Sequence, residues 1–140
     1  NGSQIMETGG YKGSGREISK ANLYRQLGDF FGISTAKIWN EYSMTELSSQ
    51  AYAQGPAGRH RCPASMRIRV VDPETRLGLP FGRRGHLLIY DVANLYSCCA
   101  IETRDFAIAH SDSEFTLLGR DPTALPRGCS RASDELLRQP

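Results

Sequence analysis

One short run of this chain combines side chains that can bind a phosphorylated ligand. Tyr42, Thr45 and Glu46 lie close together directly after a predicted strand. A threonine hydroxyl can donate a hydrogen bond to a phosphate oxygen, and a glutamate carboxylate can hold Mg²⁺. The Thr45–Glu46 pair is equally typical of a helix N-cap followed by an acid in the first turn. The sequence leaves both interpretations open.

Two later Arg-Asp dipeptides carry further candidates. Asp105 follows Thr103 and Arg104, and Asp121 follows Arg120. A carboxylate at the start of a strand can accept hydrogen bonds from both hydroxyls of a ribose, or it can be an ordinary turn residue. Arg120 can reach a ligand hydroxyl or phosphate, or it can form a surface ion pair.

A cysteine near the end of the chain could act as a nucleophile. Cys129 has Arg127 and Arg131 two positions away on either side. Positive neighbours lower a thiol pKa and enrich the thiolate, which is the nucleophilic form. The alternative is an unreactive cysteine. Among the other thiols, Cys98 and Cys99 are expected to be buried in an apolar strand, which leaves Cys62 as the main rival in reactivity.

Composition bounds the class of protein. The chain has 140 residues, which is one domain at most. Its hydrophobic content of 39% and its charged content of 23% are typical of a globular protein. A formal net charge of +2 is too small to indicate a nucleic-acid or membrane partner. The cysteine spacing is not that of a secreted scaffold, so a cytoplasmic location with reduced thiols is expected.

The hydrophobic pattern predicts an α/β (α+β) fold with a mixed β-sheet and a few flanking helices. One helix is predicted from Ser19 as N-cap to Gly32 as its end, with Tyr24, Phe30 and Phe31 on its inner side. A helical turn is predicted over residues 45–49, and a helix begins at residue 133. Strands are predicted over residues 3–8, 36–42, 66–71, 85–90, 97–101, 106–109 and 114–118.

The glycine-rich loop of residues 9–15 lies between the first predicted strand and the helix. It lacks the Gly-Lys-Ser/Thr ending of a P-loop, and its glycines do not have the spacing of a dinucleotide fingerprint. Such a loop is more often a tight connection than a ligand site. Its exposed backbone groups can nevertheless hold the flat edge of a base.

The order of these motifs resembles that of the AMP-forming, adenylating ligase superfamily. Glycine-rich loop, Tyr-x-Met-Thr-Glu, Thr-Arg-Asp and Gly-Arg-Asp follow one another as they do in that superfamily. The chain is most similar to the acyl-protein synthetase family, the ligase component of the fatty-acid reductase complex of bacterial bioluminescence. Residues 7–13 resemble that family's glycine-rich loop, and residues 125–130 resemble its C-terminal cysteine segment.

The resemblance implies a role for each candidate, with ATP and Mg²⁺ as cofactors of the complete enzyme. The roles run from the adenine pocket to the acyl acceptor: Gly9 and Gly10 line the adenine pocket, Tyr42 stacks on the base, Thr45 contacts the phosphate, Glu46 holds Mg²⁺, Asp105 binds the ribose, Arg120 assists beside a hinge at Asp121, and Cys129 accepts the acyl group as a thioester.

We therefore expect a fragment of an adenylate-forming enzyme fold. Residues 1–118 would be the C-terminal part of its core, and residues 119–140 the hinge and the acyl-accepting cysteine segment. Ser43 stands where the family has glycine, and the family's Ser/Thr/Gly-rich phosphate loop is not in this sequence. The chain is accordingly expected to be inactive alone.

The expected partners are the missing N-terminal part or a second copy of the chain, and an acyl-accepting protein is a further candidate. Self-association is expected to use apolar side chains left uncovered: Phe30, Phe31, Trp39, Leu87 and Ile89. Two other hypotheses stay open. One is a free-standing, non-catalytic module that binds nucleotide or a partner, and the other is an unrelated small α/β domain.

Overall fold

A computed structural model gives the architecture of the chain and describes residues 2–8 and 18–124. Gly9, Gly10, Cys129 and the helix predicted from residue 133 lie outside the described residues. The elements in chain order are β1 (Ile5–Thr8), α1 (Lys20–Phe31), the 3₁₀ helix η1 (Thr35–Lys37), β2 (Ile38–Tyr42), β3 (Ala51–Gln54), β4 (His60–Arg61), β5 (Met66–Val71), β6 (Arg84–Asp91), β7 (Ala100–Ala109) and β8 (Glu114–Arg120).

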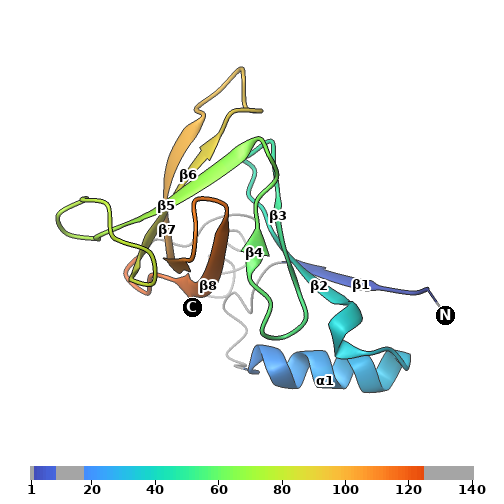
Figure 1. Ribbon diagram of the computed structural model, residues 1–140. Helices are drawn as coiled ribbons and strands as arrows, with labels where there is room; N and C mark the ends of the chain where they lie inside the picture. Colours follow the sequence, from blue (N-terminus) through green and yellow to red (C-terminus); the bar gives the residue numbers. More distant parts are fainter. Residues whose placement is uncertain (1, 9–17, 125–140) are drawn as a thin grey trace, which may run out of the picture.

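The described strands form one mixed eight-stranded sheet in the order β1-β2-β3-β4-β8-β7-β6-β5 (Figure 1). β1 and β2 are parallel and are joined through α1, because a parallel pair needs a crossover connection. The other neighbours are antiparallel. This confirms the predicted α/β fold with a mixed sheet.

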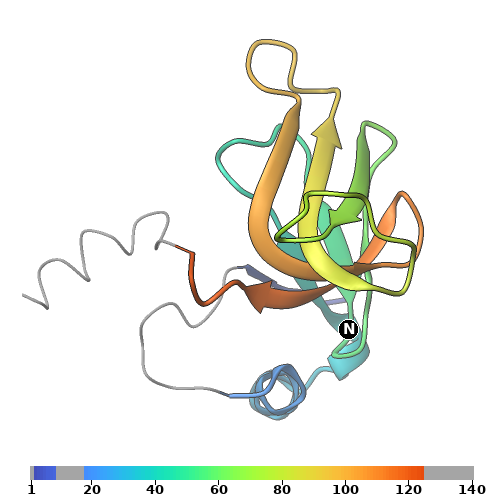
Figure 2. The same ribbon diagram turned by 90° about the vertical axis from the view of Figure 1, so that its left-hand side faces the viewer.

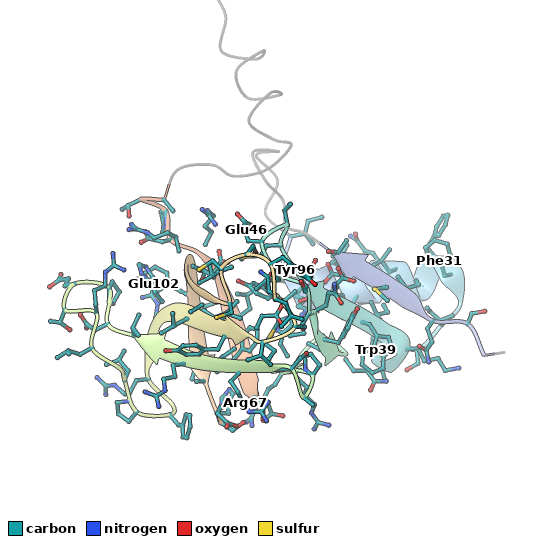
Figure 3. The ribbon with its side chains drawn as sticks, turned by 90° about the horizontal axis from the view of Figure 1, so that it is seen from above. Phe31, Trp39, Glu46, Arg67, Tyr96 and Glu102 are labelled. Carbon is teal, nitrogen blue, oxygen red and sulfur yellow. The ribbon has the colours of Figure 1, made fainter. Side chains whose placement is uncertain are left out.

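The predicted caps of α1 are correct. The Ser19 Oγ accepts a hydrogen bond from the Asn22 N–H at 3.3 Å, and Gly32 adopts a left-handed conformation with φ 64°. The predicted inner side is only partly correct. Tyr24 is fully buried, whereas Phe30 and Phe31 are 80% and 57% exposed. The two phenylalanines lie in the last turn of α1, where Phe31 is directed away from the strands (Figure 3).

The second half of the sheet curls around the main core (Figure 2). The Ile68 N–H of β5 donates to the Asp112 carbonyl at 2.7 Å, which brings β5 against the β7–β8 turn. Leu87 and Ile89 are fully buried here, so the expectation that they lie on an uncovered face is wrong. The buried core residues are Tyr42, Ala51, Met66, Ile68, Val70, Leu87, Ile89, Ala107, Ala109 and Phe115.

Several predicted element boundaries differ from the structure. β7 is one strand where two were predicted, and residues 97–99 precede it as a bend. The charged run from Glu102 to Asp105 concealed the continuity of this strand. The sequence analysis also missed β3 and β4, which are short and carry few β-branched side chains. No helix in the described part of the chain is long and apolar enough to cross a membrane.

Candidate functional site

Three of the predicted site residues meet at one carboxylate. The Tyr42 hydroxyl donates to Asp105 Oδ2 at 2.8 Å, and Arg120 Nη1 donates to Asp105 Oδ1 at 3.3 Å. These residues come from β2, β7 and β8. β2 and β7 are separated in the sheet by three strands, so the Tyr42–Asp105 bond spans the curl of the sheet. The site therefore places an aromatic ring, a carboxylate and a guanidinium together.

The register of β7 and β8 explains why Arg120 meets Asp105. These two residues are direct partners in the antiparallel ladder. Side chains alternate between the faces of a strand, so the next residues along each strand, Arg104 and Asp121, pair on the other face. The Arg104 Nη2 donates to Asp121 Oδ2 at 3.1 Å. Two Arg-Asp dipeptides thus form two reciprocal ion pairs, one on each face.

Tyr42 is tightly held at the end of β2. Its ring lies edge-to-face against Phe115 at 5.5 Å and against His60 at 6.0 Å between ring centroids, and only 7% of the residue is exposed. Burial, together with the nearby Asp105 carboxylate, raises the pKa of the Tyr42 hydroxyl far above its usual range. The phenol is therefore a permanent hydrogen-bond donor that orients Asp105.

Thr45 and Glu46 lie in an exposed turn directly after β2. The Leu47 N–H donates to the Met44 carbonyl at 3.0 Å, and no helix follows within the described residues. The N-cap interpretation and the predicted helical turn are both wrong for this segment. The Asn94 Nδ2 donates to the Glu46 carbonyl at 2.9 Å, which links the turn to the β6–β7 loop that carries Tyr96 (Figure 3).

Asp91, a residue that the sequence analysis did not identify, anchors this turn. It is fully buried at the end of β6. Its Oδ2 accepts from the Ser48 N–H at 2.8 Å and the Ser49 N–H at 2.7 Å, and its Oδ1 accepts from the Ser49 hydroxyl at 2.7 Å. Burial alone raises the pKa of Asp91, but the hydrogen bonds outweigh it and hold the pKa below the usual range.

A second polar cluster lies between α1 and the sheet. The Lys20 ammonium donates to Asn40 Oδ1 at 3.2 Å, and the same oxygen lies 2.7 Å from His60 Nε2. The Tyr24 hydroxyl donates to Glu7 Oε1 at 3.0 Å. Burial, with a smaller effect of the Lys20 charge, lowers the pKa of His60 to about 4. The period of two from Tyr42 to Asn40 could have indicated that Asn40 faces inward. The spacing of His60 and Cys62 suggests a metal-ligand pair at most, and it does not indicate the burial of His60 beside Asn40.

The described cysteines differ from their predicted environments. Cys98 and Cys99 are exposed in the bend before β7, so their predicted burial in an apolar strand is wrong. Cys62 is half-buried, and burial raises its pKa to about 11 although Arg67 acts in the opposite direction. The exposures of the described cysteines are therefore the reverse of those predicted.

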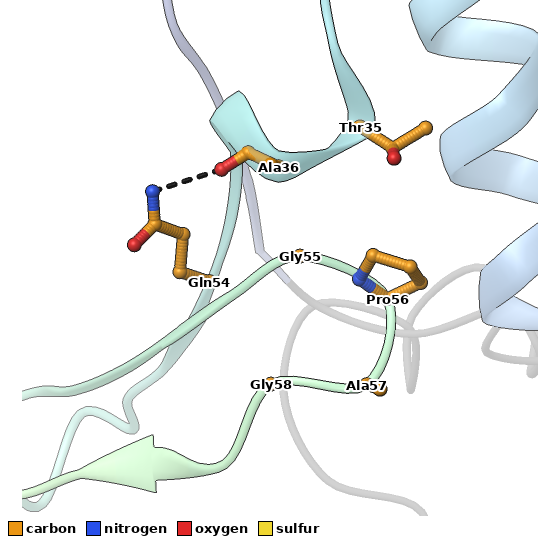
Figure 4. Close-up of a pocket in the computed structure, with 7 residues that line it drawn as sticks. All are labelled: Thr35, Ala36, Gln54, Gly55, Pro56, Ala57 and Gly58. Carbon is orange, nitrogen blue, oxygen red and sulfur yellow. Dashed lines mark hydrogen bonds between the residues drawn. The ribbon is translucent and has the colours of Figure 1, made fainter.

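Two surface hollows lie away from the predicted site residues. One, of about 450 Å³, lies between η1 and the β3–β4 turn, where Gln54 Nε2 donates to the Ala36 carbonyl at 2.8 Å (Figure 4). The other, of about 670 Å³, contains Trp39, Tyr52 and Cys62. In the described part of the chain, no three His, Cys, Asp or Glu side chains are grouped closely enough to hold a metal ion. Asp105, Tyr42 and Arg120 line neither of these two hollows.

Comparison with known structures places this fold. The chain is similar to apo MatB from Rhodopseudomonas palustris, with a TM-score of 0.58 and 16% identity over 87% of this chain and 26% of that one. The similarity to ATP-bound MatB has a TM-score of 0.51 and 18% identity, over 71% of this chain and 23% of that one. The chain is also similar to an adenylation domain of a keto acid-selecting NRPS module, bound to keto acyl adenylate. The TM-score is 0.58 and the identity 16%, over 84% of this chain and 29% of that one.

The fold is that of part of an adenylate-forming enzyme. The chain spans about a quarter of the length of the structures it matches. No protein-family model matches it, and no curated protein matches it in sequence. The predicted fold class is confirmed, while membership of the acyl-protein synthetase family remains a prediction.

Replacing Asp91 with Asn should destabilise the chain by about 2–3 kcal/mol, because a neutral amide cannot replace the buried carboxylate as acceptor for several donors. The matched control is Asp112→Asn. Asp112 is exposed and pairs at 3.4 Å with Arg67, which is also exposed, and such surface ion pairs contribute little to stability. Urea denaturation at neutral pH measures both. A loss no larger than that of the control would show that Asp91 does not anchor the turn.

The same pair of variants gives a pH test. The pKa of Asp91 is lowered on folding, so its contribution is complete above the ordinary value of 3.8 and is lost as the pH falls through the lowered folded value. The stability difference between wild type and Asp91→Asn should therefore shrink below about pH 4. A difference that stays constant down to about pH 2 would contradict this assignment.

Limited alkylation near neutral pH should label Cys98 and Cys99 before Cys62, because they are exposed and the raised pKa of Cys62 leaves little thiolate. Peptide mapping by mass spectrometry identifies the first site modified. Cys129, outside the described residues, is still predicted to react before all three. First labelling at Cys62 would contradict the structural order, and Cys129 reacting last would contradict its proposed activation.

Proposed function

We propose that this chain is the nucleoside-binding, C-terminal portion of an AMP-forming acyl-protein ligase. It would act with the rest of such an enzyme and make no acyl adenylate alone. The observation that carries the proposal is the meeting of Tyr42, Asp105 and Arg120 at one carboxylate. The family resemblance assigns Tyr42 to the base and Asp105 to the ribose, with Arg120 assisting, and the fold is that of a portion of adenylate-forming enzymes.

The arrangement at Asp105 suits a ribose. The Asp105 side chain is 14% exposed, so its carboxylate borders solvent while Tyr42 and Arg120 fix its orientation. A carboxylate has about four lone-pair sites, which leaves acceptor capacity for ligand hydroxyls beyond these two hydrogen bonds. The Arg120 guanidinium pairs with Asp105 at 3.3 Å and is 34% exposed, so it brings a positive charge to the solvent side of the site.

The exposed turn suits a metal-bound phosphate. Mg²⁺ is usually held by one or two carboxylates together with substrate phosphates, so the single exposed carboxylate of Glu46 fits it. Thr45 beside it supplies a hydroxyl donor for a phosphate oxygen. The Asp91 hydrogen bonds fix the backbone of the residues that follow this turn.

ATP would supply the adenylyl group that turns a carboxylate into an acyl adenylate. In the proposed second step the Cys129 thiolate attacks the acyl carbon, the carbon–oxygen bond to AMP breaks, and AMP leaves with the electron pair. The flanking Arg127 and Arg131 favour the thiolate form of Cys129. A fatty acyl group and an acyl-accepting protein partner are the finer parts of this proposal and follow from the family resemblance.

A second candidate function, a non-catalytic and dimeric binding module, is favoured by one observation. β1 is an edge strand of the described sheet and is paired in parallel, although parallel strands are normally buried. Met6 on β1 is 60% exposed, and the exposed Phe30 and Phe31 contact each other at 4.8 Å between ring centroids. This edge would be covered by the rest of a ligase or by a second copy of the chain.

Asp105→Asn should weaken ATP binding by roughly tenfold, because it removes a charged acceptor from the ribose. Asp112→Asn is the matched control at an exposed carboxylate and should bind as wild type. Glu46→Gln should leave Mg²⁺-free binding unchanged and abolish the gain that Mg²⁺ provides. Isothermal titration with ATP, with and without Mg²⁺, measures all of these. Undetectable ATP binding by wild type at millimolar concentration, or acyl-adenylate formation by the chain alone, would contradict the proposal.

The double substitution of Phe30 and Phe31 to Ser should convert a dimer of this chain to a monomer, because it removes exposed apolar area from the proposed contact. Tyr96→Ser is the control, since Tyr96 is fully exposed on the β6–β7 loop. Sedimentation velocity at increasing concentration gives the oligomeric state. A wild-type chain that stays monomeric, or a dimer that only the control disrupts, would exclude this surface as the dimer contact.

A further inference from the structure

A buried polar network surrounds Asp121, directly after the site residue Arg120. The Asp121 Oδ1 accepts from the Thr123 N–H at 2.8 Å and the Thr123 hydroxyl at 2.7 Å. The Asp121 Oδ2 accepts from Arg104 Nη2 at 3.1 Å and lies 3.0 Å from His86 Nε2. Both oxygens of this carboxylate are therefore occupied by donors from β6, β7 and its own turn.

Among the three residues that contact the Asp121 side chain, His86 alone is buried. It is 1% exposed on β6, and its ring packs against Phe106 at 4.9 Å between centroids. The guanidinium of Arg84, which is on the same strand, also stacks on Phe106, at 4.0 Å from the ring centroid. His86 is thus fixed by packing, and it offers Asp121 a rigid attachment that the half-exposed Arg104 does not.

A second carboxylate faces the other side of the His86 ring. The Nδ1 of His86 lies 3.8 Å from the Oε1 of Glu102, and both of these atoms are buried without a hydrogen-bond partner. The other carboxylate oxygen of Glu102 pairs with Arg76. His86 therefore lies between two acids, of which only Asp121 is within hydrogen-bond distance, and each acid also pairs with an arginine, Arg104 or Arg76.

We propose that His86 is a positioning residue for the nucleoside site. It would hold Asp121, and through Asp121 the end of β8, so that Arg120 on the opposite face stays against Asp105. The proposal rests on the nucleoside-binding role of Asp105 and Arg120. The physical link is short, because Asp121 is covalently next to Arg120 and its N–H donates to the Arg104 carbonyl at 2.8 Å. Loss of the His86 attachment would leave Asp121 held to the sheet by its contacts with Arg104 alone, so Arg120 would be less firmly fixed against Asp105.

The proposal also bears on the hinge that the family resemblance placed at Asp121. A residue whose side chain accepts hydrogen bonds from three other residues cannot change its backbone angles without breaking them. The hydrogen bonds to Thr123 extend the fixed segment by two more residues. Any hinge motion of this chain would then require release of Asp121 from His86 and Arg104, or would begin after Thr123.

The test compares His86→Leu, which removes the donor, with His86→Gln, whose amide N–H can replace Nε2–H. His110→Leu is the matched control, because His110 has a hydroxyl partner, Thr116, at 2.9 Å in the β7–β8 hairpin, distant in sequence from Asp121. Two quantities are measured on the whole chain: the NMR signals of the Arg120 guanidinium, which report its contact with Asp105 without any ligand, and ATP binding by titration.

His86→Leu should release Arg120, seen as averaged guanidinium signals, and weaken ATP binding by roughly tenfold. His86→Gln should restore both, and His110→Leu should change neither. ATP binding that is equal in wild type and His86→Leu would overturn the positioning role and leave the proposed function intact. If wild type binds no ATP, the proposed function fails, and the NMR signals of the Arg120 guanidinium alone test the positioning role of His86. Averaged signals in His86→Leu and in neither other variant would support that role, and unchanged signals in His86→Leu would overturn it.

A second variant covers the case in which His86→Leu does not fold. Thr123→Val removes a hydroxyl that lies 2.7 Å from Asp121 Oδ1 and 3.0 Å from Arg104 Nη2, at an exposed position. Thr123→Val should average the Arg120 guanidinium signals as His86→Leu does, but to a smaller extent. Unchanged Arg120 signals in Thr123→Val, together with an unfolded His86→Leu, would mean that the contacts of Asp121 do not position Arg120, and would overturn the proposal.

Discussion

The antiparallel pairing of Arg104-Asp105 with Arg120-Asp121 is the constraint on which the site depends. A ladder in which Asp105 lies opposite Arg120 sends one Arg-Asp pair to each face of the sheet. A shift of the register by one residue would bring like charges together and move every side chain to the other face. The charges therefore specify the register as well as the site, and this explains why a charged run can occupy the middle of a long strand.

The two faces use the same ion pair for different purposes. On one face Asp105 is partly exposed and keeps acceptor capacity beyond its bonds to Tyr42 and Arg120, which suits a ligand. On the other face the Asp121 carboxylate is fully engaged, chiefly by Thr123, with further hydrogen bonds from His86 and Arg104, and these hold the pKa of Asp121 at about 2 although burial acts in the opposite direction. One carboxylate is available for binding, and the other is committed to structure.

Much of this arrangement was predictable from the sequence because the deciding signals are local. The caps at Ser19 and Gly32, the alternation of β5 and the order of the motifs were all visible. The convergence of Tyr42, Asp105 and Arg120 followed only from the family resemblance, since no periodicity relates β2 to β7. Asp91, His60 and His86 were missed because a buried polar residue is identified by its partners, and partners distant in sequence leave no pattern.

The errors of the sequence analysis share a cause in burial. Cys98 and Cys99 are apolar enough for a buried strand, yet they lie in a bend tied by the hydrogen bond from the Asp91 N–H to the Cys99 carbonyl. Phe30 and Phe31 follow the apolar period of α1, but the sheet does not cover the last turn of that helix. For the phenylalanines the predicted helix is correct, and the element that would bury them is not in place; for the cysteines the predicted strand itself begins only at Ala100. For the two phenylalanines this favours a covering surface from another part of a ligase or from a second copy, because exposed adjacent aromatic rings beside a parallel edge strand cost hydration free energy that such a contact would recover.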